Sequence, residues 1–213
     1  MKKNVTRRND FSRYIIILCL SLIGAAVGAQ SLNMKPLSAD MLARRAKSLA
    51  AAAAQVTDAP VPCVADETKI AGLYAPGPVA VFLIGDKKLS EDIIKRAGKE
   101  PVSVGVLFFI SLAPLSNGHP VAADTLRIVT VKGQEGDDRK LSLMHLAVVN
   151  EGGQPKLQFY AKGKQPLLET PLVAANGAGV VDIHAKPAEK GASLTLTFAG
   201  KYQATLPVAP QTW

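Results

Sequence analysis

The sequence predicts a mainly β fold: an antiparallel β-sandwich, or a partly open barrel, of about eight or nine strands. Apolar residues recur at every second position in several short stretches beyond residue 63. Glycine, proline and asparagine residues that favour turns separate these stretches. Helical patterns are confined to the start of the chain and one short insertion, so the crossover helices of a parallel sheet are not indicated.

The clearest element is the stretch Lys140–Lys162, whose pattern is typical of a β-hairpin. Apolar residues alternate with other residues on both sides of the turn Asn150–Pro155, for example at Leu157 and Phe159. The turn contains two glycines, which tolerate positive φ angles, and a proline, which lacks the N–H group that a ladder needs. We therefore predict two strands joined by a loop slightly longer than the tightest hairpin turns.

Residues 1–29 have the composition of a secretory signal peptide. Met1–Arg13 is basic, Tyr14–Ala29 carries no charge, and small side chains precede a cleavage point after Ala29. The uncharged run is shorter than the roughly 20 residues of a membrane-spanning helix. We therefore expect an exported protein, periplasmic or extracellular. The alternative is an inner-membrane protein that keeps residues 14–29 as an uncleaved anchor.

Half of the net charge of +8 lies in that leader. The leader holds five of the 25 basic residues and one of the 17 acidic residues, so the remaining chain carries a net charge of +4. These basic residues are dispersed, a pattern that does not favour nucleic-acid binding. Cys63 is the one cysteine beyond the leader, so no internal disulfide is expected. Its thiol is either buried and inert or available to a second chain.

Residues 30–62 are predicted to form a helix followed by a proline-containing linker. Ala39–Val56 lacks glycine and proline, and Ser38 is a suitable N-cap. Apolar residues seven positions apart form a narrow stripe beside Arg44 and Arg45. Such a stripe packs on the domain, pairs with a helix of another chain, or belongs to a spacer. We favour a helix that packs on the domain or acts as a spacer, because fewer than three heptads are short for a coiled coil.

Residues 63–208 are predicted to form the β-sandwich domain, and residues 209–213 a C-terminal tail. A short helix, Leu89–Ala97, is inserted with Ser90 at its start. Ala113–Asp124 is expected to be the longest irregular connection. Besides the hairpin, strands are expected at Thr68–Tyr74, Val79–Ile84, Pro101–Leu112, Leu126–Val131, Leu167–Val173, Val180–Ala185, Ala192–Phe198 and Lys201–Leu206.

The local patterns of common catalytic sites are missing from the sequence. No serine lies between glycines at a strand-to-helix turn, and no glycine-rich loop of the phosphate-binding type occurs. Aromatic residues make up 5% of the chain, which is low for a carbohydrate-binding platform. We therefore expect no catalytic residue and no cofactor, and favour a binding protein over an enzyme.

One candidate metal site remains. In a strand, Asp182 and His184 project from the same face about 7 Å apart, so a carboxylate and an imidazole can share an ion. His145, on the predicted hairpin, is the third ligand if its strand lies alongside, and His119 is a further group in the long connection. Polar residues that alternate along an exposed sheet face give the same pattern without any function, so both interpretations stay open.

The favoured hypothesis is an exported, non-enzymatic module that binds another envelope or secreted protein, or another component of the cell envelope. Sheet edges, the Ala113–Asp124 connection and the helix stripe are its candidate contact surfaces. One alternative is a metal-binding protein or metal-dependent enzyme that uses His145, Asp182 and His184. The other is a carrier of a small molecule or lipid inside a barrel. Membrane contact is expected only through an uncleaved N-terminal segment.

Overall fold

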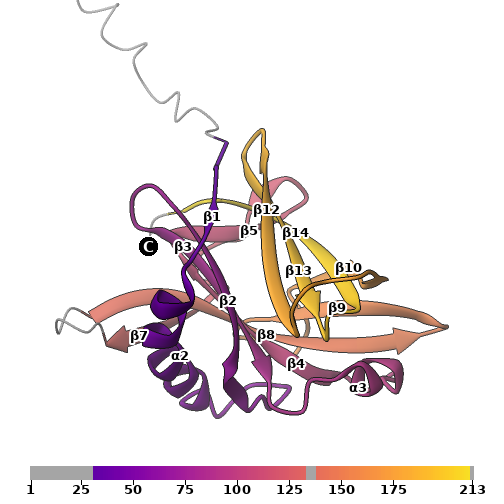
Figure 1. Cartoon of the computed structure of the whole chain (residues 1–213). Coiled ribbons are helices and arrows are strands. Elements are labelled where there is room, and N and C mark those ends of the chain that lie inside the picture. The colour runs from indigo at the N-terminus through magenta and orange to yellow at the C-terminus, as the bar shows by residue number, and fades with distance from the viewer. Residues whose placement is uncertain (1–30, 133–137, 212–213) are drawn as a thin grey trace, which may run out of the picture. The chain divides into compact units, whose positions relative to one another are not determined.

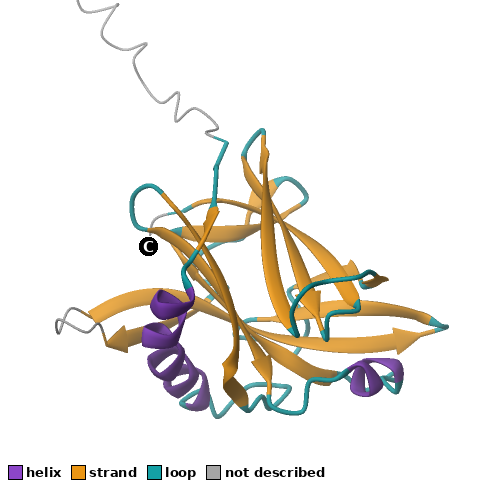
Figure 2. Cartoon of the chain, in the orientation of Figure 1, coloured by secondary structure: helices purple, strands orange, loops and turns teal. Residues whose placement is uncertain are grey.

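Two antiparallel sheets and two helices make up the part of the chain that the computed structural model describes, residues 31–132 and 138–211 (Figure 1, Figure 2). The sheets contain eight and six strands. The predicted mainly β, antiparallel fold is confirmed. The predicted number of strands is too low, because strands of only two to five residues carry little periodic signal. The predicted signal segment, residues 1–29, lies outside the described residues, as do residues 133–137 and 212–213.

The eight-stranded sheet has the spatial order β1-β2-β3-β4-β8-β9-β10, and β7 also pairs with β8. Its strands are β1 (Lys35–Pro36), β2 (Ala65–Ala75), β3 (Val79–Asp86), β4 (Val102–Ile110), β7 (Arg127–Lys132), β8 (Asp138–Glu151), β9 (Gln154–Tyr160) and β10 (Leu168–Pro171). The long strand β8 pairs with β4 along one edge. Its other edge pairs first with β7 and then with β9.

The six-stranded sheet has the order β12-β13-β14-β5-β6, and β11 also pairs with β14. Its strands are β5 (Leu112–Ser116), β6 (His119–Pro120), β11 (Val173–Ala174), β12 (Val181–Ala188), β13 (Gly191–Phe198) and β14 (Tyr202–Pro210). The sequence predicts a single strand over Pro101–Leu112, but the chain changes sheets there. Ser111 has a φ of 51° and separates β4 from β5.

Two turns differ from the prediction. The β8–β9 turn is tighter than expected, because Glu151 pairs directly with Gln154 and the two glycines between them have φ angles of 68° and 84°. Positive φ at both central residues is the geometry that favours two-residue hairpin turns. The Ala113–Asp124 connection is not wholly irregular. Asn117 and Gly118, with φ angles of 51° and 77°, join β5 to β6 in the same way.

The eight-stranded sheet buries apolar side chains on both faces, because neighbouring side chains of a strand point in opposite directions. On one face Leu107 packs in a cluster with Phe198 of the other sheet. On the opposite face Phe108 and Leu143 pack with Leu49 of helix α2 (Ala39–Ala54). This second layer places α2 on the outer face of the sheet.

Helix α2 begins and ends close to the predicted positions. The Ser38 side chain accepts a hydrogen bond from the Met41 N–H group, which confirms the predicted N-cap. The buried side chains of α2 face the sheet, so the apolar stripe packs against the chain's own β structure. The second helix, α3 (Glu91–Lys95), is shorter than predicted and is capped by Ser90 as expected. Neither helix in the described ranges is long and apolar enough to cross a membrane.

Candidate functional site

An open trough follows one side of α2, where the helix lies over the sheet. Two hollows form it, with volumes of about 290 and 540 Å³. Arg44 and Arg45 line both hollows, so the two lie next to each other at these side chains. The helix residues that line them recur three or four positions apart, and therefore share one face of the helix. They are Met41, Arg44, Arg45, Lys47, Ser48, Ala51 and Ala52, together with Gln55 at the C-terminal cap. This face is about 21 Å long, at 1.5 Å per residue.

The floor and the far wall of the trough come from the sheet. The first hollow is lined by apolar groups of β3, Ala80 and Phe82, and by Tyr74 of β2, which is 41% exposed. The second hollow is lined by three consecutive residues of β7, Thr130 to Lys132. Consecutive strand residues point to opposite faces, so a hollow that meets all three borders the edge of the strand. The trough thus runs from an apolar end to the edge of β7.

The lining of the trough is predominantly basic. Its cationic side chains are Arg44, Arg45, Lys47, Lys132 and Arg139, and the acid among the lining residues is Asp138. Arg44 is held along the helix by Asp40, with an Nη2–Oδ2 distance of 2.8 Å, and both side chains are largely exposed. Clustered cationic groups in a concave surface concentrate the positive potential there and attract anionic groups.

A polar group is buried on the same face of the sheet, beyond the end of α2. His145 is 1% exposed, and neither ring nitrogen has a hydrogen-bond partner among the described residues. Burial, reinforced by the nearby positive charge of Arg127, lowers the pKa of His145 to about 4, and Asp58 partly opposes this shift. The imidazole is therefore neutral at physiological pH.

Arg127 links this buried region to the segment that follows α2. Its guanidinium forms two bonds to the Asp58 carboxylate, at 2.9 and 3.0 Å, and its Nε group donates a hydrogen bond to the Ala161 carbonyl oxygen. The hydrogen bond from Arg127 holds the pKa of Asp58 below its ordinary value. Val61, from the same segment, packs with Ala147 and Tyr160. These contacts hold the segment after α2 against the sheet.

Cys63 lies at the end of that segment and is half-buried. Burial raises the pKa of its thiol to about 12, so the thiol stays protonated and unreactive at neutral pH. The neighbouring carboxylate of Asp86 is also buried, and it accepts hydrogen bonds from the Val64 and Lys88 N–H groups and the Ser103 hydroxyl. These bonds satisfy the hydrogen-bonding capacity of the carboxylate, which belongs to the last residue of β3.

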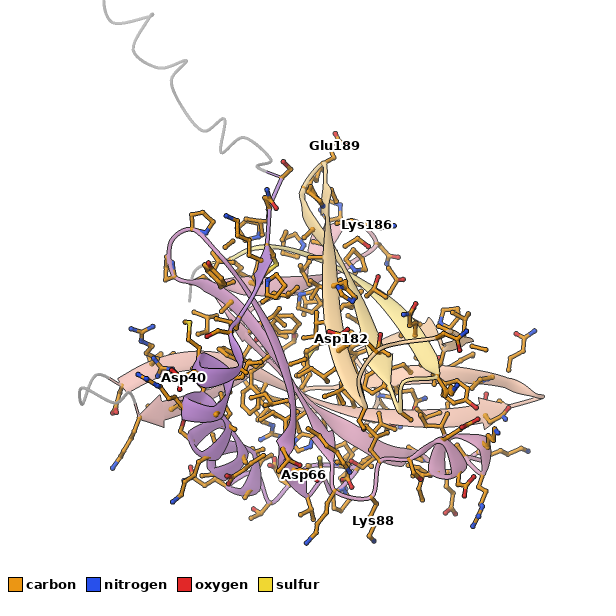
Figure 3. The ribbon with its side chains drawn as sticks, in the orientation of Figure 1. Asp40, Asp66, Lys88, Asp182, Lys186 and Glu189 are labelled. Atoms are coloured by element: carbon orange, nitrogen blue, oxygen red, sulfur yellow. The ribbon has the colours of Figure 1, made fainter. Side chains whose placement is uncertain are left out.

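The residues predicted to bind a metal are only partly brought together. Asp182 and His184 lie on β12, with a distance of 3.0 Å between Asp182 Oδ2 and His184 Nε2. Figure 3 labels Asp182 on this strand. His145 lies on β8 in the other sheet. Within residues 31–132 and 138–211, no three histidine, cysteine, aspartate or glutamate side chains group as a metal site requires. His119, at the start of β6, is exposed.

The trough contains residues that sequence reasoning did not single out as a site. Arg44 and Arg45 were visible beside the helix stripe, and their position on the helix is the signal that points to an exposed basic face. The contribution of β7 carries no sequence signal, because it depends on which strands pair with β8. Comparisons of the chain with protein-family models, curated proteins and solved structures gave no match.

Proposed function

We propose that this chain is an exported, non-enzymatic module that binds an acidic segment of another protein in the trough beside α2. One observation carries the proposal: two adjacent hollows share Arg44 and Arg45, and their lining is basic, with apolar groups in the floor. Such a surface suits a partner that presents carboxylates together with apolar side chains. The export of the chain is part of the proposal and follows from residues 1–29.

The shape of the trough favours an elongated ligand over a compact one. Its length of about 21 Å matches about six residues of extended chain. Both hollows are open at the surface, whereas the space between the sheets is filled by packed side chains such as Phe109 and Phe159. A lipid or small-molecule carrier needs an enclosed apolar cavity. The open trough therefore favours a protein segment as the ligand.

The test is binding of a defined acidic peptide, acetyl-Val-Glu-Val-Glu-Val-Glu-amide with a fluorescent label, measured by fluorescence anisotropy. The variant Arg44→Gln/Lys47→Gln removes two exposed charges from the trough. The matched control, Lys186→Gln/Lys190→Gln, removes two exposed charges from the β12–β13 hairpin, on which Figure 3 labels Lys186. At about 0.5–1 kcal/mol for each exposed charge pair, the trough variant is expected to bind roughly 5- to 30-fold more weakly.

Three further results are expected if the trough is the site. The control variant binds like the natural chain, added salt weakens binding, and a peptide with lysine in place of glutamate does not bind. Equal affinity for the acidic and basic peptides, or equal losses in the two variants, would contradict the proposal.

A further inference from the structure

Among the strands that the structure describes, β7 pairs with β8 alone, so its edge that faces away from β8 has no strand partner there. β4 occupies the opposite edge of β8, and β9 follows β7 along the same edge. None of the backbone hydrogen bonds formed by turns and loops in the described ranges ends on residues 127–132. An unpaired strand edge presents a row of N–H and C=O groups that can pair with another extended chain.

β7 also lacks most of the features that protect strand edges. Its central residues, Ile128 to Val131, are all β-branched, and its register with β8 runs without a bulge. The other long strand at the end of a sheet, β12, carries Pro187 and the charged residues Asp182 and Lys186. Proline and charged side chains are the usual means of blocking an edge. The two strands differ in this respect although both lie at a sheet edge.

The open edge adjoins the basic trough. The larger hollow is lined on one side by α2 residues such as Lys47 and Ser48, and on the other by Thr130, Val131 and Lys132 of β7. A chain that paired with β7 would therefore run along this hollow. Its side chains would alternate between the two faces of the extended sheet, and those on the α2 side would enter the trough.

We propose that β7 accepts an extended, acidic segment of a partner protein as an added antiparallel or parallel strand of the eight-stranded sheet. This inference rests on the proposed function and specifies its binding mode. Backbone hydrogen bonds to β7 supply affinity, and carboxylates near Lys47 and Lys132 supply selectivity. A second copy of this chain fits less well, because antiparallel pairing of two β7 strands places the Lys132 end of one copy near the Arg127 end of the other.

The binding mode is tested with N-methylated forms of the same acidic peptide and the natural chain. One form carries N-methyl groups on the valines and the other on the glutamates. Both keep the peptide's charge and side chains, but each removes the N–H donors of one peptide edge. Only one edge of an added strand pairs with β7. We therefore expect one form to bind at least tenfold more weakly than the other.

Hydrogen–deuterium exchange provides the second measurement. Saturation with the unmodified peptide is expected to slow exchange of amides within residues 127–132 and to leave residues 181–188 of β12 unchanged. If both methylated forms bind as tightly as the unmodified peptide, strand addition is wrong, while the charge dependence described above still supports the trough. If the unmodified peptide does not bind, both proposals are wrong. If the chain forms a dimer that protects the same amides, β7 pairs with a second copy of the chain, and the proposal of an acidic partner segment is wrong.

Discussion

Arg127 and Asp58 join the first residue of β7 to the segment after α2 through two parallel bonds, Nη1–Oδ1 at 2.9 Å and Nη2–Oδ2 at 3.0 Å. The guanidinium is mostly buried, with 14% of the side chain exposed, whereas the Asp58 side chain is 67% exposed. The pair lies near the buried His145, whose pKa responds to both charges. It therefore connects the position of β7 to the segment that covers the outer face of the sheet.

Replacing Arg127 with methionine is expected to lower the free energy of unfolding by about 1–3 kcal/mol, because the bonds to Asp58 and to the Ala161 carbonyl oxygen are lost together. Asp58→Asn should lower the free energy of unfolding by less, because the carboxylate is solvated and Arg127 keeps its hydrogen bond to the Ala161 carbonyl oxygen. Urea denaturation measures both. Equal losses in the two variants would show that the bond to Ala161 contributes little.

Stability is expected to fall as the pH falls from about 6.5 to about 4. The folded pKa of His145 is lowered to about 4, whereas an unfolded histidine titrates near 6.5. Between these values the unfolded chain binds more protons, so acid favours unfolding, by a total on the order of 3 kcal/mol. Denaturation at several pH values should show this loss. His145→Leu should remove most of it, and His119→Leu, at an exposed position, should not.

Helix α2 is expected to be an integral part of the β structure. Leu49 is 2% exposed and packs in the cluster beneath the helix, so Leu49→Ala should lower the free energy of unfolding by about 2–5 kcal/mol. Met41, which is 50% exposed on the same helix, provides the control, and Met41→Ala should have a small effect. A normal unfolding free energy for Leu49→Ala would mean that the helix is only loosely attached.

Gly105 is expected to tolerate no side chain. It lies at a bulge between β4 and β8, and a Cβ atom there would approach the Ile84 carbonyl oxygen to 2.3 Å. The backbone of β4 and of β3 would have to move, so Gly105→Ala should lower the free energy of unfolding by about 2–4 kcal/mol. Gly98→Ala is the matched control, because its Cβ atom would meet nothing within 4 Å. Thermal unfolding of the two variants should separate them clearly.

Much of the secondary structure could be predicted because it depends on local patterns. Ser38 and Ser90 cap their helices as expected, and the β13–β14 reversal occurs where Ala199 and Gly200 take positive φ angles. The prediction is wrong where one local sequence pattern is compatible with two different structures. The apolar residues on both sides of Ser111 predict one strand and do not indicate the change between sheets. The Asn117-Gly118 pair forms a tight turn between β5 and β6, in a stretch where an irregular connection is expected.

The candidate site depends partly on local sequence and partly on tertiary structure. The sequence by itself determined that α2 carries a basic face beside an apolar stripe, because helical spacing places those residues on adjacent sides of one element. Only the tertiary structure decided that this face lies along the open edge of β7, and that His145 and His184 belong to different sheets. The physical reason is that strand pairing depends on backbone hydrogen bonds between distant segments, which side-chain periodicity within one segment does not specify.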